Sequence, residues 1–67
     1  MFVVIELQKN ADGVVSNLVT CHATQIEAES KYYSILASAA LSTIPLHSAI
    51  VVSEEGFPLM HQCYKQV

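Results

Sequence analysis

The segment TQIEAESKYYSILASAALSTI, residues 24–44, is the only stretch of the chain long enough to predict a full-length α-helix. The Thr24 hydroxyl can accept a hydrogen bond from a free amide of the first turn while Glu27 reaches back toward it, which is the T-x-x-E pattern of a capping box. Pro45 ends the helix, because it lacks an amide hydrogen and disfavours a helical conformation at Ile44. One helix, about 30 Å long, should therefore cross the molecule.

Apolar residues cover most of the circumference of this predicted helix. A rotation of 100° per residue gathers one broad apolar face, which we expect to pack on a sheet: Ile26, Tyr33, Leu36, Ala37, Ala40, Leu41 and Ile44. A helix on a single sheet needs an apolar stripe only somewhat wider than ~100°. The apolar residues beyond that stripe, Ala28, Tyr32, Ile35 and Ala39, are therefore expected to form an interface with another chain.

Four segments before and after the helix have the composition of β-strands, and two short turns join them in pairs. Residues 2–8 and 14–22 flank the turn Asn10–Gly13, and residues 46–53 and 57–64 flank the turn Glu54–Gly56. In the first segment Val3, Ile5 and Leu7 fall on one face, and Phe2, Val4, Glu6 and Gln8 fall on the other. The predicted order of elements is ββαββ, an α+β fold in a single domain of residues 1–67.

The hydrophobicity of the strands favours one order of the antiparallel sheet. Residues 2–8 and 46–53 are the most apolar, so we expect them in the centre, which gives the order 2-1-3-4 with the helix on one face. The order 1-2-4-3 is the alternative, and it would leave these strands at the edges. Phe2, Val4, Ile50 or Val51 should then occupy the sheet face that the helix leaves free.

Length and charge limit the classes of function. A 67-residue chain hides only about 60% of its unfolded surface, so a hydrophobic fraction of 52% favours oligomerisation, with a dimer as the first expectation. The net charge of −3, with three lysines and no arginine, argues against nucleic-acid binding. No apolar run approaches the ~20 residues of a membrane span. We expect a cytoplasmic protein whose Cys21 and Cys63 stay reduced.

The residues that could carry chemistry form no familiar motif. Cys21, His22, His61 and Cys63 have zinc-ligand atoms but not the usual spacing, so we expect no metal and no cofactor. A Cys–His nucleophilic pair would need an activated thiolate and an oxyanion hole, and we expect no catalytic residue and no enzyme. His47 is expected to be a strand-end histidine without a special role.

Four short runs of residues are distinctive: A-E-S-K-Y at Ala28–Tyr32, I-P-L-H-S-A at Ile44–Ala49, the E-E-G turn at Glu54–Gly56 and the closing C-Y-K at Cys63–Lys65. In these runs the chain resembles a family of short uncharacterised proteins of gut Firmicutes and their phage-like gene regions. The resemblance covers nearly the whole chain and implies a bacterial or phage setting. It implies no activity and no functional residue.

Three hypotheses for the function follow from the sequence. The leading one is a small non-enzymatic, oligomeric protein-interaction module of unknown partner, with a phage-derived regulator or inhibitor that docks on a host protein as its narrower form. Self-association could use a sheet face, a helix face or an edge strand, and the sequence does not choose among them. The second is a small-ligand or metal-binding protein that uses Tyr32 and Tyr33 or the Cys/His set. The third is a small enzyme with Cys21 or Cys63 as its nucleophile.

Overall fold

The computed structural model describes residues 1–66 and contains the five expected elements in the order ββαββ. Their bounds are β1 Phe2–Lys9, β2 Val15–His22, α1 Gln25–Leu41, β3 Leu46–Ser53 and β4 Pro58–Lys65. The four strands form one antiparallel sheet in the order β2-β1-β3-β4. The predicted fold class and the favoured strand order are both confirmed.

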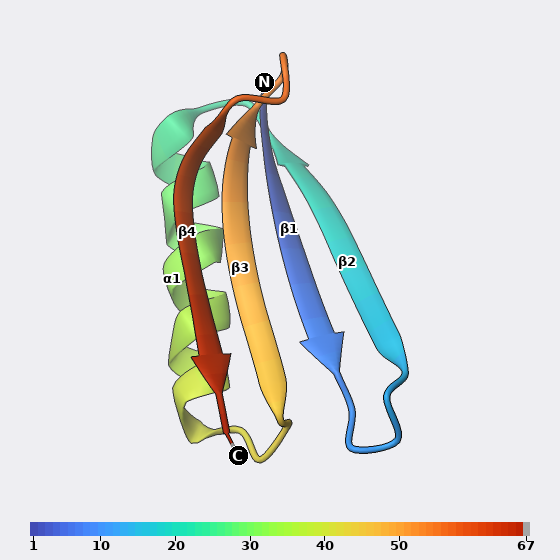
Figure 1. Ribbon diagram of the computed structural model, residues 1–67. Helices are drawn as coiled ribbons and strands as arrows, with labels where there is room; N and C mark the ends of the chain where they lie inside the picture. The colour runs from blue at the N-terminus through green and yellow to red at the C-terminus, as the bar shows by residue number, and fades with distance from the viewer. Residues whose placement is uncertain (67) are drawn as a thin grey trace.

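The molecule has two layers, with α1 packed against one face of the sheet (Figure 1). The helix contacts mainly β1 and β3, the central strands. Both turns place a glycine at a positive φ angle, +88° at Gly13 and +87° at Gly56, which a side chain would disfavour. The β1–β2 turn and the C-terminal end of α1 lie at one end of the sheet, and the β3–β4 turn lies at the other (Figure 1).

The helix is shorter than the sequence predicts, and its two ends explain its bounds. Thr24 is the N-cap, its hydroxyl oxygen accepting from the Glu27 amide at 3.2 Å, while its hydroxyl donates to the Glu27 carboxylate at 3.0 Å. The helix stops at Leu41 because Ser42 takes an extended conformation and its Oγ accepts from the Ile44 amide at 3.0 Å. This local bond competes with a further helical turn.

The face of α1 that packs on the sheet is opposite to the expected one. The four residues predicted to form an interface with another chain lie in the core of the single chain, each 0–4% exposed: Ala28, Tyr32, Ile35 and Ala39. Ile26, Tyr33 and Leu41, predicted to face the sheet, are 55–88% exposed, and of the large residues within α1 on that predicted face only Leu36 packs against the core. The assignment of Ala28, Tyr32, Ile35 and Ala39 as interface residues is therefore wrong for this chain.

Close packing explains this reversal. Ala28, Tyr32, Ile35 and Ala39 recur at the three- and four-residue spacing of a narrow helical stripe. The alanine side chains of this stripe are small, and Ala49 on β3 is also small, so the helix backbone can approach the sheet closely. Core residues Val4 and Val51 fill the space between the two layers.

On β1 the two faces are exchanged relative to the prediction, whereas on β3 one of the predicted alternatives, Ile50, does lie on the free face. Val4 and Val51 point toward the helix, together with Phe2. Since side chains alternate along a strand, Val3, Ile5 and Leu7 point away from it. Of the residues expected on the free face, only Ile50 lies there, and Phe2, Val4 and Val51 do not.

Candidate functional site

The sheet face opposite to α1 is an apolar surface that no other element within residues 1–66 covers. We call it the open face. It consists of the odd-numbered residues of β1 from Val3 to Lys9 and of β2 from Val15 to Cys21, the even-numbered residues of β3 from Leu46 to Val52, and Pro58, His61, Cys63 and Lys65 of β4. Figure 1 looks onto this face, with the helix behind it.

Strand register arranges the open face as four rows that cross all four strands. From the β3–β4 turn downward, the rows are Cys21-Val3-Val52-Pro58, Val19-Ile5-Ile50-His61, Asn17-Leu7-Ser48-Cys63 and Val15-Lys9-Leu46-Lys65. Strands about 4.8 Å apart with a rise of about 3.3 Å per residue give a face of about 500 Å². Five of its sixteen positions are polar or charged, namely Lys9, Asn17, Ser48, His61 and Lys65, so the apolar part of the face is smaller than this. A contiguous apolar patch of roughly a few hundred Å² on a soluble chain is often an interaction site.

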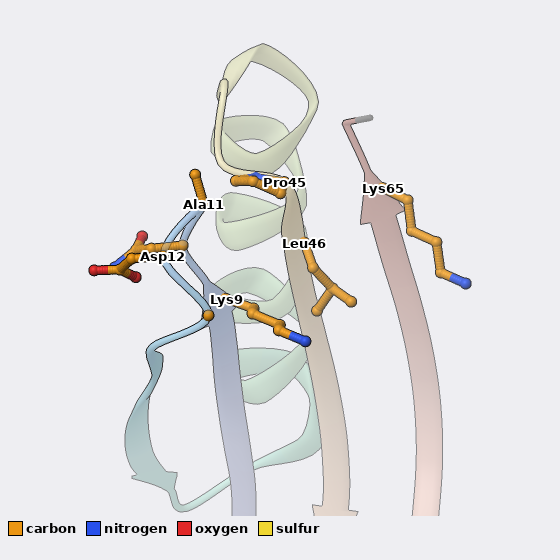
Figure 2. Close-up of a pocket in the computed structure, with 8 residues that line it drawn as sticks. Lys9, Ala11, Asp12, Pro45, Leu46 and Lys65 are labelled. Atoms are coloured by element: carbon orange, nitrogen blue, oxygen red, sulfur yellow. The ribbon is translucent and has the colours of Figure 1, made fainter.

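The last row gives one end of the open face a positive charge. Lys9 and Lys65, two of the three lysines of the chain, flank Leu46 there. They line a depression of about 600 Å³ whose remaining wall is Pro45 and the β1–β2 turn. In Figure 2, Lys9 extends across β3 beside Leu46, Lys65 projects outward from β4, and Asp12 points to the opposite side.

The opposite end of the sheet is acidic. Glu54 and Glu55 occupy the β3–β4 turn, and both are exposed. The Met1 ammonium group lies 3.1 Å from the Glu54 carboxylate and offsets part of this charge. The long axis of the sheet therefore runs from a lysine end to a glutamate end.

A second, smaller apolar surface lies on the outer side of α1. Ile26, Tyr33 and Leu41 are its large residues, and they project into solvent. Exposed Ser30 lies between Ile26 and Tyr33 along this side of the helix, and exposed Ala37 lies between Tyr33 and Leu41. The large residues of this surface, which we call the helix ridge, form one narrow line along α1. The open face extends across four strands.

The cysteines and histidines considered for metal binding do not come together. Cys21 is on β2 and Cys63 is on β4, the two outer strands, and both thiols are free. His61 shares the open face with them, but His22 points to the helix side, where Thr20 Oγ1 lies 2.9 Å from its Nε2. In the described part of the chain, no three potential metal ligands of the Cys, His, Asp and Glu types cluster.

The two neighbouring tyrosines are divided between the core and the surface. Tyr32 is buried and Tyr33 is exposed, and their rings meet edge to face with centroids 5.2 Å apart. Burial, with the nearby Tyr33 and Tyr64, raises the pKa of the Tyr32 hydroxyl. The pair therefore does not line a common ligand pocket.

A buried polar cluster on the helix side of the sheet was missed by the sequence analysis. His47 is only 3% exposed, and its Nε2 donates to Glu6 Oε2 at 2.6 Å, while the Gln8 amide donates to the same oxygen at 3.0 Å. His47 Nδ1 is buried and has no hydrogen-bond partner within residues 1–66. A narrow groove of about 140 Å³ beside the cluster is lined by Glu6, Gln8, Ser16, Asn17 and Leu18. His47 lies near the start of β3, as expected, but it is buried and bound to Glu6, which the sequence did not indicate.

The environment of Glu6 favours its charged form. Burial alone would raise its pKa, but the hydrogen bonds from His47 and Gln8, with the electrostatic attraction of His47 and Lys31, together outweigh burial. The pKa of Glu6 in the folded chain is consequently lower than the ordinary value of 4.5. A carboxylate with a depressed pKa stabilises the fold above its unfolded pKa, and this contribution disappears as the pH falls through the folded pKa.

We predict that Glu6→Gln lowers the free energy of unfolding at pH 7 by about 1.5–3 kcal/mol, because hydrogen bonds to a charged group are lost. The deficit should shrink below about pH 4.5, where the wild-type carboxylate itself becomes protonated. Urea unfolding of both proteins between pH 7 and pH 3 measures this difference. Glu29→Gln on α1 is the matched control, and an equal deficit for Glu6→Gln at pH 7 and pH 3 would contradict the prediction.

No helix within residues 1–66 is long and apolar enough to cross a membrane. No protein-family model matches this chain, and no curated protein or solved structure is significantly similar to it.

Proposed function

We propose that the chain is a small non-enzymatic protein-interaction module that works as an oligomer and binds its partner through the open face. The observation that carries the proposal is the uncovered second face of the sheet. A sheet with two apolar faces is stable when a second layer covers each of them. The chain supplies one such layer, α1, so we assign the other to a second protein surface.

The open face is favoured over the helix ridge and the β4 edge. The helix ridge has only the small residues Ser30 and Ala37 between its three large ones, which limits the apolar area that a partner could cover. The β4 edge carries Pro58 and a register shift between Val51 and Val52, and both interrupt strand pairing. On the open face Pro58 and the register shift affect only the first row, and the uninterrupted second row contains Val19, Ile5 and Ile50.

Protection of a native cysteine tests this proposal directly. Cys21 lies on the open face and is exposed in the single chain. Its labelling by a maleimide should be at least tenfold slower at 500 µM protein than at 1 µM, because a partner covers it at the higher concentration. The matched control is Ser38→Cys on the outer side of α1, in a Cys21→Ser/Cys63→Ser background.

The control cysteine should react at the same rate at both protein concentrations. Equal labelling rates of Cys21 at both concentrations, with sedimentation showing a monomer throughout, would overturn self-association through the open face.

A further inference from the structure

We infer that the partner on the open face is a second copy of this chain, placed by a twofold axis that runs across the strands, so that the lysine end of each sheet lies over the glutamate end of the other. This inference rests on the function proposed above. It adds the identity of the partner and the orientation of the two copies.

The area of the open face fits a second copy. Two faces of about 500 Å² bury about 1,000 Å² in total, which is near the lower limit for a specific interface. Stacked sheets pack about 10 Å apart with their strands within about 30° of each other. Two copies of the same flat, four-stranded face have matching dimensions, so each can cover the other along its whole length.

Charge selects the direction of stacking. Two twofold arrangements bring the open faces together, and they differ in which ends meet. With Asp12 and the Met1 ammonium group included, the lysine end of each copy has a net charge of +1 and the glutamate end a net charge of −1. An axis along the strands would place the two positive ends together and the two negative ends together. An axis across the strands places two lysines and two glutamates at each end, so like charges are separated and opposite charges are adjacent.

The depression at the lysine end supports the same direction. Pro45 and Leu46 are apolar residues of its lining, and Lys9 and Lys65 are the basic ones. The crosswise axis brings the β3–β4 turn of the other copy to this end. That turn contains the exposed side chain of Phe57 next to the Glu54–Glu55 pair. Its apolar ring suits Pro45 and Leu46, and its carboxylates suit Lys9 and Lys65.

Charge reversal tests the orientation. Lys9→Glu/Lys65→Glu makes both ends acidic, and Glu54→Lys/Glu55→Lys makes both ends basic. In the proposed dimer each variant should raise the dimer Kd at least about tenfold in 50 mM NaCl, because four exposed charge pairs change sign. Combining all four substitutions should return the Kd to within about threefold of the wild type, and 0.5 M NaCl should reduce all these differences. Sedimentation equilibrium measures each Kd.

The distance between two spin labels tests the orientation of the two copies independently of their charges. A spin label at Ala11→Cys, in the Cys21→Ser/Cys63→Ser background, lies at the tip of the β1–β2 turn. In the proposed dimer the two labels are at opposite ends, and their separation should be close to the 34 Å length of the chain. Stacking with the axis along the strands would bring them within about 15 Å, because the turns then meet at the same end.

The outcomes separate the orientation from the proposed function. The protein could form a dimer that protects Cys21 but has a short distance between the labels and a Kd that charge reversal does not change. That result would overturn the orientation and leave the proposed function standing. A chain that stays monomeric at 1 mM and whose Cys21 reacts at the control rate would overturn both.

Discussion

Ile35→Asp should leave the chain largely unfolded at 25 °C. Ile35 is 4% exposed and packs in the core with Val4, Ala49 and Val51. The substitution removes a large apolar side chain and places a carboxylate where no solvent reaches it, which together cost at least about 4 kcal/mol. A domain of this size has a total stability of only about 3–10 kcal/mol. Circular dichroism should show the loss of the cooperative thermal transition.

A milder core variant and a surface variant complete this test. Ile35→Val should retain the fold and lower the free energy of unfolding by about 1 kcal/mol. Leu41→Asp, at the most exposed large apolar position, should change the melting temperature by only a few degrees. An Ile35→Asp protein that melts like the wild type would show that a different face of α1 packs on the sheet.

Ile50→Lys should abolish self-association while the single chain remains folded. Ile50 lies in the second of the four rows of the open face, between Ile5 and His61. In a free monomer the lysine side chain can reach water along the uncovered sheet. In a twofold interface two lysines would be buried without partners, which costs several kcal/mol. The dimer Kd should therefore rise at least about 100-fold, as measured by sedimentation equilibrium.

Tyr33→Lys, on the outer side of α1, is the control for this variant. It also places a lysine at an exposed apolar position, and it should leave the Kd unchanged. If Tyr33→Lys dissociates the protein and Ile50→Lys does not, the helix ridge is the interface and the function proposed for the open face is wrong. Chemical denaturation of Ile50→Lys at low concentration checks that its fold is intact.

The elements and their order could be predicted from the sequence because local signals agree with the fold. The turns carry Gly13 and Gly56, the helix begins with a capping box at Thr24, and Pro45 separates it from β3. The central position of β1 and β3 followed from their hydrophobicity, since the edges of a sheet favour polar residues. These signals depend on nearest neighbours along the chain, so they can be interpreted without tertiary contacts.

The orientation of the helix and of the sheet could not be predicted, because both elements are apolar on two sides. On α1 the stripe through Ala28 and Ile35 competes with the ridge through Ile26 and Leu41, and the ridge is the more hydrophobic. The smaller residues pack on the sheet because they allow a close approach, which depends on the facing residue Ala49. Hydrophobicity alone therefore favoured the wrong side.

The Glu6–His47 pair was missed for a related reason. In β1 the residues Glu6 and Gln8 share a face with Phe2 and Val4, and that face was expected on the side of the sheet that the helix leaves free. The register of β1 with β3 places Gln8 beside His47, and the neighbouring Glu6 binds the imidazole. A partner 41 residues away satisfies the carboxylate, and only the strand order and register together could have identified it.

The two outer strands differ in how they would template fibre growth. β4 begins with Pro58 and shifts register beside it, so an incoming strand cannot continue the ladder along its full length. β2 runs unbroken from Val15 to His22 and pairs with β1 at every residue, so its outer row of amides and carbonyls is a regular template. Aggregates formed at high expression should therefore nucleate on β2, and a proline at an outward-facing amide of that strand should raise the soluble yield.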